Sequence, residues 1–271
     1  MTQYIDIAVN LLSERLKHDI DTIISDAAKQ HVSPLIVIAS DVDESVQASL
    51  LCQQYPQQLF STAGVHPHQA SSWNEKSSET LAQLALQPHV VAMGECGLDY
   101  NRDFSPRAIQ RQVFAAQLEL ACQLNMPVLM HCRDAHDDFI AIVNEYRNAL
   151  PKALLHCFTG THGELNACLE ADLYIGITGW ICDERRGQEL ATLVPLIPNN
   201  RIMAETDSPY LLPRSMRPKP KSSKNLPQYL PYIVQSVAQL RQQPVTELAH
   251  YCFQNSCDFF GLDPIQLMVD D

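Results

Sequence analysis

The chain has 271 residues, of which 46% are hydrophobic and 18% are charged, as in ordinary globular proteins rather than disordered ones. Its formal net charge of -12 argues against a protein that coats duplex nucleic acid, although a local basic patch could still contact phosphates. It has nine cysteines without a CxxC pair, no run that approaches the ~20 apolar residues of a membrane span, and no secretory segment near the start. We therefore expect a soluble cytoplasmic protein with reduced thiols and no membrane partner.

Strand-like apolar runs alternate with helix-like segments along the whole chain. The eight expected strands are residues 4–9, 35–39, 60–65, 90–94, 128–130, 153–155, 173–177 and 202–206. Amphipathic stretches between them include residues 19–31, 45–55, 79–86 and 108–124. The last of these follows Ser105, a candidate N-cap, and Pro106 at the expected first helical position. Two closing helices are expected at 227–239 and 245–260, with Gly261 ending the second.

Eight β-α units predict a closed (β/α)₈ TIM barrel, with one domain over residues 1–271 and closing helices at about 227–262. The main alternative is an open doubly wound sheet. That fold would favour a glycine-rich phosphate turn after the first strand, and residues 8–11 contain no glycine.

Four potential metal ligands follow apolar runs that read as strands buried on both faces: Glu95, His131, His156 and Asp207. The carboxyl ends of barrel strands meet at one face, so these imidazoles and carboxylates could share a divalent cation. Such a cation would activate water for hydrolysis, and we assign Asp207 to orient the water and accept its proton. Alternatively, the histidines hydrogen-bond to the backbone and the carboxylates cap helices.

A cysteine follows each of three proposed ligands, namely Cys96, Cys132 and Cys157, which raises the alternative of a thiolate zinc site. Neighbouring side chains of a strand point to opposite faces. If the histidines point into the barrel mouth, the cysteines point toward the helices, and we favour their being small buried hydrophobic residues.

Five ordered segments closely resemble the TatD family of metal-dependent deoxyribonucleases, and the resemblance spans nearly the whole chain. They are Gly64-Val65-His66-Pro67-His68, Gly94-Glu95-Cys96-Gly97-Leu98-Asp99, Met130-His131-Cys132-Arg133-Asp134-Ala135, Leu155-His156-Cys157-Phe158-Thr159-Gly160 and Glu205-Thr206-Asp207-Ser208-Pro209-Tyr210-Leu211. Residues 176–180 and 182–187 extend the likeness.

The resemblance implies a TIM-barrel nuclease of the metal-dependent, amidohydrolase-like hydrolase type. It further implies that the nuclease is magnesium-dependent, is found in the cytoplasm, and trims single-stranded DNA, and also RNA, from the 3′ end. It places Glu95, His131 and His156 as metal ligands and Asp207 as the catalytic aspartate. It also places His66 near the substrate phosphate, where Arg133 could neutralise charge. The alternatives for these last two are a loop-packing histidine and a surface arginine. The ligand set alone does not select Mg²⁺, because imidazoles suit Mn²⁺ or Zn²⁺ better.

The first strand departs from the wider family, which begins with Asp-x-His-x-His where this chain has Asp6-Ile7-Ala8-Val9-Asn10. Ala8 cannot bind a metal and Asn10 offers only a neutral oxygen. We therefore expect one firmly held ion rather than two.

Basic residues between 214 and 224 are expected to form a phosphate-binding loop near the mouth, unless that loop is simply solvated. Trp180 could stack on an unpaired base, as could Tyr100, although packing under a loop is the ordinary alternative and is favoured for Tyr100.

These features predict a monomeric 3′-5′ exonuclease with a role in DNA repair or degradation. The alternatives are a metal-dependent hydrolase of a small C-N or C-O substrate, since the same water activation serves both, and a non-catalytic barrel that binds nucleic acid or a partner.

Overall fold

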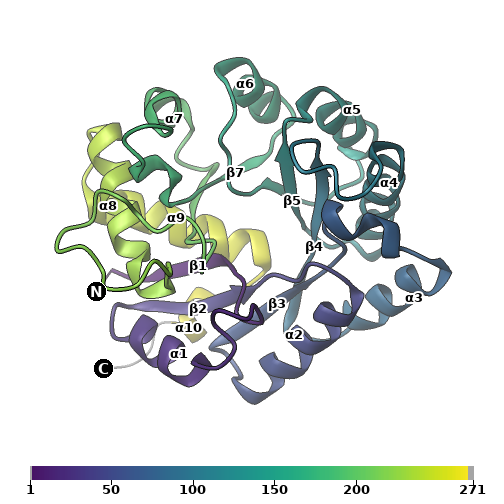
Figure 1. Ribbon diagram of the computed structural model, residues 1–271, viewed down its shortest axis with the longest axis horizontal. Helices are drawn as coiled ribbons and strands as arrows, with labels where there is room; N and C mark the ends of the chain where they lie inside the picture. Colours follow the sequence, from purple (N-terminus) through teal and green to yellow (C-terminus); the bar gives the residue numbers. More distant parts are fainter. Residues whose placement is uncertain (1, 268–271) are drawn as a thin grey trace.

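Eight parallel strands form one sheet in sequence order in the computed structural model, which describes residues 2–267. Figure 1 looks onto the resulting barrel. The strands are β1 (Tyr4–Val9), β2 (Val32–Val37), β3 (Leu59–Ala63), β4 (Val90–Asp99), β5 (Val128–Arg133), β6 (Ala153–Leu155), β7 (Tyr174–Ile177) and β8 (Ile202–Ala204). The predicted TIM barrel is therefore confirmed, and the doubly wound alternative is wrong because each strand pairs with its sequence neighbours.

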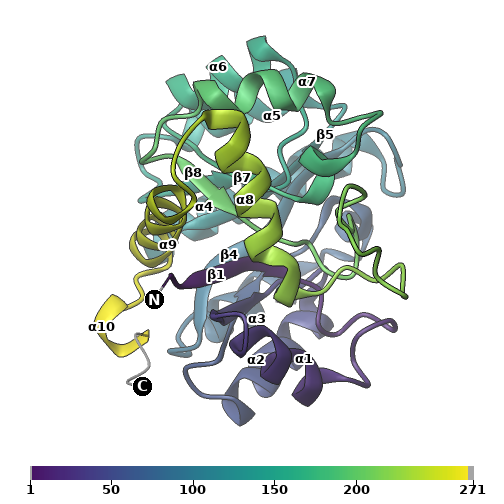
Figure 2. The same cartoon turned by 90° about the vertical axis from the view of Figure 1, so that its left-hand side faces the viewer.

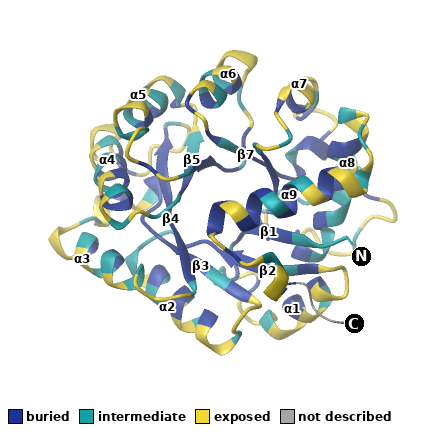
Figure 3. Ribbon diagram, turned by 180° about the vertical axis from the view of Figure 1, so that it is seen from behind, coloured by how far each residue is buried: buried dark blue, intermediate teal, exposed yellow. Residues whose placement is uncertain are grey.

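Helices α1 to α8 lie around the outside of the strands, whereas α9 and α10 lie across one end of the barrel (Figures 1 and 3). They are α1 (Ile20–Ala28), α2 (Val42–Gln54), α3 (Glu75–Leu84), α4 (Arg107–Leu124), α5 (His136–Tyr146), α6 (His162–Glu170), α7 (Gln188–Leu193), α8 (Leu230–Arg241), α9 (Val245–Phe260) and α10 (Pro264–Leu267). Short 3₁₀ segments lie at η1 (Pro67–Ser72), η2 (Gly179–Cys182), η3 (Val194–Leu196) and η4 (Pro227–Tyr229). No helix in residues 2–267 is long and apolar enough to cross a membrane.

Two apolar layers hold the barrel together. One lies inside it, where strand residues such as Ile7, Ile36, Leu129 and Met203 meet Phe253 of α9. The other lies between the strands and the surrounding helices. Figure 3 shows the corresponding division of the helices into buried inner and exposed outer faces. These two layers explain why the strands read as continuous apolar runs.

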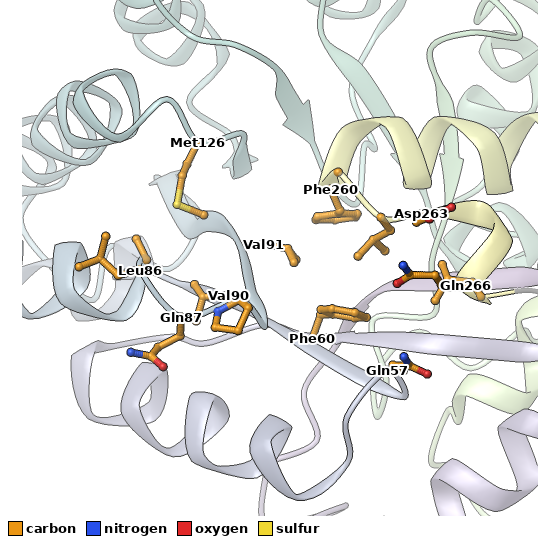
Figure 4. A pocket seen from close by; sticks show the side chains of 15 residues that line it. Gln57, Phe60, Leu86, Gln87, Val90, Val91, Met126, Phe260, Asp263 and Gln266 are labelled. Carbon is orange, nitrogen blue, oxygen red and sulfur yellow. The ribbon is translucent and has the colours of Figure 1, made fainter.

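The seam between β1 and β8 is the least regular part of the barrel. The two strands are linked by an isolated bridge between Val9 and Ser208, and α9 packs against both. Helices α9 and α10 lie at the end where the strands begin, while the loops after the strands lie at the opposite end (Figure 2). A pocket of about 460 Å³ lies beside α10, and its lining includes Phe60, Val91, Phe260 and Gln266 (Figure 4).

The structure corrects two local predictions. Strand β4 does not end at Gly94 but continues to Asp99, because Gly94 and Gly97 adopt positive φ values of 126° and 138° and let the chain pass close to β5. Ser105 is not an N-cap, since α4 begins at Arg107 and Pro106 precedes it. Gly261 ends α9 in the left-handed conformation, as predicted.

Candidate active site

The side chain of Glu95 is the centre of a histidine cluster at the barrel mouth. Its Oε1 atom lies 2.8 Å from Nε2 of His156, 3.1 Å from Nδ1 of His131 and 3.3 Å from Nε2 of His66. Glu95 lies inside β4 and His131 inside β5, whereas His156 directly follows β6. The structure therefore brings three of the four predicted ligands, Glu95, His131 and His156, together at one point, with His66 beside them.

One ligand atom from each of His66, Glu95 and His131 lies within 4.8 Å of the others, so this group could hold a metal ion. Imidazole nitrogen and carboxylate oxygen form a donor set for a divalent cation. His156 approaches Glu95 still more closely but falls outside that triplet. Whether each of these histidines can bind a metal depends on what its second ring nitrogen contacts.

Two buried carboxylates lie behind two of these histidines. Asp99 Oδ2 is 3.3 Å from Nε2 of His131, and Glu205 Oε2 is 3.3 Å from Nδ1 of His156. A carboxylate on one ring nitrogen fixes the proton there and leaves the other nitrogen free to bind a metal. This role was not predicted from the sequence for Asp99 or Glu205, although both occur in the family-like motifs.

His66 has the opposite arrangement. Its Nδ1 accepts a hydrogen bond of 3.1 Å from the backbone N–H of His68, so in the neutral ring the proton is on Nε2, the atom that faces Glu95. Burial lowers the pKa of His66, although Glu95 acts in the other direction, and so favours this neutral form. His66 is therefore arranged to donate a hydrogen bond rather than to offer a lone pair.

The pKa values of Glu95 and of the imidazoles around it depend on one another. Burial raises the pKa of Glu95, but His156 and the other imidazoles outweigh burial and bring that pKa well below its usual range. Burial lowers the pKa values of His131 and His156, but the carboxylates around each ring outweigh it and raise them. The Glu95 carboxyl group is thus favoured in its charged form, which is the form that binds a cation.

Asp207 follows β8 on the same side of the barrel. Burial and the charges of Glu95 and Glu205 raise its pKa to about 7, and the charge of His156 acts in the opposite direction. Asn10 donates a 3.0 Å hydrogen bond from Nδ2 to its Oδ1. Ala8 is fully buried in the apolar layer inside the barrel. The two first-strand positions noted above thus serve packing and the orientation of Asp207.

The predicted substrate contacts have different surroundings. Arg133 is exposed at the end of β5, opposite Asp99 in the strand register. Trp180 is partly buried, with its Nε1–H donating to the carbonyl of Arg186 at 3.1 Å and the guanidinium of Arg186 4.2 Å from its ring centre. Tyr100 donates a 2.6 Å hydrogen bond to Asp138, which fits the packing role favoured for it.

The cysteines do not join the histidine cluster. Cys96 belongs to the layer between strands and helices, and Cys132 packs against that layer. Burial raises the pKa of both thiols, and it raises the pKa of Cys157 to about 12. A thiol with a raised pKa stays protonated at neutral pH, which disfavours a thiolate zinc site.

A basic cleft of about 760 Å³ opens beside the loops that follow β7 and β8. Its cationic lining residues are Arg185, Arg186, Arg214, Arg217, Lys219 and Lys221. Asp183 and Glu184 also line it, and Asp183 forms an ion pair of 2.8 Å with Arg186. Positive charge therefore remains concentrated at one rim of an acidic protein, where it would attract a polyanion.

The fold and the site define a TIM barrel whose mouth holds a group of residues that could bind a metal ion. Among solved structures, an amidohydrolase from Saccharomyces cerevisiae superposes with a TM-score of 0.83 at 21% identity, covering 96% of this chain and 100% of the other. The TatD homologue YJJV from Escherichia coli K12 gives a TM-score of 0.88 at 24% identity, covering 97% and 99% of the two chains. At such identities these likenesses establish the fold alone.

The family described as TatD related DNase matches residues 5–261, and the chain belongs to this family of nucleases. A relative from Escherichia fergusonii, named 3′-5′ ssDNA/RNA exonuclease TatD, is 50% identical over 257 residues, which are 95% of this chain and 98% of the relative. The family resemblance inferred from the five sequence motifs is thus confirmed.

Proposed function

We propose that this protein is a metal-dependent 3′-5′ exonuclease that acts on single-stranded DNA and on RNA. The observation that carries the proposal is the cluster around Glu95, in which buried carboxylates orient two histidines toward the same oxygen. The activity named for the relatives at about 50% identity supports the choice of substrate.

We assign the cation to Glu95, His131, His156 and Asp207. The first three converge within hydrogen-bonding distance, and Asp207 is near enough for its charge to be coupled to theirs. When bound, the cation would lower the pKa of a water and polarise a phosphoryl oxygen. We propose Mg²⁺, with Mn²⁺ and Zn²⁺ as the alternatives to be compared, and one ion rather than two because Ala8 and Asn10 supply no further strong ligand.

The remaining residues have separate tasks. Asp207, which follows β8 on the same side of the barrel as the cluster, is suited to orient the attacking water and accept its proton. The Nε2–H of His66 is suited to donate to a phosphate oxygen, and the exposed Arg133 to neutralise the phosphate charge. Trp180 borders the basic cleft through Arg186, so we place the rest of the nucleic acid strand along that side.

The basic cleft also favours a nucleic acid over a small C-N or C-O substrate, because a small neutral substrate would not require six cationic side chains at the rim. We further propose that the protein is a cytoplasmic monomer that takes part in DNA degradation or repair. Size-exclusion chromatography and cell fractionation would test the first two statements.

An end-labelling experiment tests the proposed activity. Purified protein is incubated with single-stranded DNA labelled at its 5′ end, with Mg²⁺, Mn²⁺, Zn²⁺ or chelator, beside Asp207→Asn. We expect a ladder that shortens from the 3′ end, requires a cation and disappears in the variant. Asp172→Asn is the control, because Asp172 precedes β7 at the opposite end of the barrel and pairs with Arg147.

Binding of intact DNA without cleavage would instead favour the non-catalytic barrel. Full activity of the Asp207→Asn variant would show that another group accepts the proton.

A further inference from the structure

Phe104 is a large apolar side chain that the fold leaves 66% exposed, in the loop between β4 and α4. Its ring meets that of His68 edge-to-face, with centroids 4.8 Å apart, and the ring of His68 meets that of His66 in the same way at 4.3 Å. A row of three rings therefore leads from the cluster around Glu95 to solvent.

The loop that carries Phe104 is held firmly on both sides of this residue. Asp99 accepts hydrogen bonds from the backbone N–H groups of Asn101 and Arg102 at 3.0 and 2.8 Å. The fully buried Ser105 donates to the carbonyl of His68 and accepts from the backbone N–H of Ser71, each at 3.0 Å. Phe104 is thus exposed on a loop that hydrogen bonds hold on both sides of this residue.

His68 is fixed as well, because its Nε2 lies 2.8 Å from Oδ2 of Asp99, the carboxylate that also faces His131. The same carboxylate therefore positions a candidate metal ligand and the inner member of the exposed ring pair. Such rigidity lowers the entropy that a bound flat ring would have to offset.

We propose that the exposed ring of Phe104, which His68 supports edge-on, is a stacking platform for an unpaired nucleobase at the 3′ end of the substrate. This inference rests on the proposed exonuclease function and adds a base-binding residue to it. A nucleobase fits this place because the rings begin at the candidate hydrolytic site and end in solvent, and every base has a π-face regardless of sequence. A base in a duplex must first unpair and unstack to enter such a site, which costs free energy, so the platform favours single strands.

Binding measurements in an Asp207→Asn background test the platform without cleavage. Fluorescence anisotropy with a short labelled single strand should show that Phe104→Ala weakens binding roughly 5- to 100-fold, which corresponds to the loss of one stacked base. Phe104→Trp should retain binding. Leu86→Ala is the matched control, because Leu86 is 77% exposed and lines the pocket beside α10 at the opposite end of the barrel.

A second substrate, abasic at its two 3′-terminal positions, separates stacking from loop damage. If the platform exists, the abasic strand binds the Asp207→Asn parent and its Phe104→Ala derivative almost equally. The platform would be overturned if Phe104→Ala lowered the affinity for both strands equally. It would also be overturned if the Asp207→Asn parent bound neither strand. Strand binding that depends on Phe104, in a wild-type protein that cleaves nothing, would overturn only the proposed nuclease function.

Discussion

The carboxylate of Glu205 offers the most specific test of how the candidate metal site is built. This side chain is fully buried, with Oε1 accepting from the backbone N–H of Cys157 and Oε2 facing Nδ1 of His156. The substitution Glu205→Gln keeps the shape but turns one oxygen into a donor. If the amide oxygen stays on Cys157, the NH₂ group meets Nδ1 of His156 and moves the ring proton to Nε2, the nitrogen assigned to the metal.

The opposite orientation of the amide is also unfavourable, because it places the NH₂ group against the backbone N–H of Cys157. We therefore expect a large effect in either orientation. A buried donor left without an acceptor costs about 1–3 kcal/mol, and loss of a carboxylate behind a metal-binding histidine typically weakens metal affinity 10- to 100-fold. The second range corresponds to ~1.4–2.7 kcal/mol. We therefore expect Mn²⁺ affinity to fall by one to two orders of magnitude.

Isothermal titration calorimetry of the metal-free proteins with Mn²⁺ measures this effect, and thermal unfolding in chelator measures any general loss of stability. Asp172→Asn serves again as a control that removes a carboxylate at the other end of β7. Unchanged Mn²⁺ affinity in Glu205→Gln, together with weakened binding in Asp207→Asn, would refute the orienting role.

Three further predictions concern buried positions. Burial raises the pKa of Asp6 from 3.8 to about 8 despite its hydrogen bonds with Thr206, so the folded state keeps a proton that the unfolded state loses. Between those two pKa values the free energy of unfolding should fall as pH rises, by up to about 1.4 kcal/mol per pH unit, and urea titrations at pH 6 and 8 should show that Asp6→Asn lacks this contribution. An equal slope in both proteins would contradict the assignment. Gly97→Ala should lower the melting temperature strongly, because the new methyl group would overlap the carbonyl of His131, whereas Gly163→Ala in α6 has open space and should add up to about 1 kcal/mol. Similar melting temperatures for the two variants would count against this packing argument. Asp99→Asn should weaken Mn²⁺ binding about as much as Glu205→Gln, since Asp99 has the same place behind His131, and calorimetry as above would reveal an exception.

The barrel was predictable because its strands are local features of the sequence. The run Ala153–Leu155 is wholly apolar and Tyr4–Val9 is apolar except for Asp6, and the structure gives both with the predicted bounds. The opposite orientations expected for His131 and Cys132 also follow from strand geometry, and Cys132 does pack against the layer beneath the helices. These inferences needed only the spacing of residues within one segment.

The contacts that orient the candidate ligands could not be predicted in the same way, because they depend on register between segments. Strand β4 runs on to Asp99 through two glycines and shifts its register against β5 between Met93 and Cys96. That shift pairs Gly97 with His131 in the ladder, and Asp99 lies two residues further along the same strand. A local pattern that ended the strand at Gly94 placed Asp99 in a loop, where no contact with His131 could be foreseen.

In the first strand, one local departure from the family pattern changes the roles that its residues have at the site. The methyl group of Ala8 fills the barrel interior, and the amide of Asn10 donates a hydrogen bond to Asp207. Asp6, on the same strand, hydrogen-bonds Thr206 beside Asp207. Strand β1 therefore supports the segment after β8 from two positions. Because this support consists of hydrogen bonds, substitutions of Asp6 or Asn10 should change the orientation of Asp207. The candidate ligands themselves lie on β4, β5 and the segments after β6 and β8.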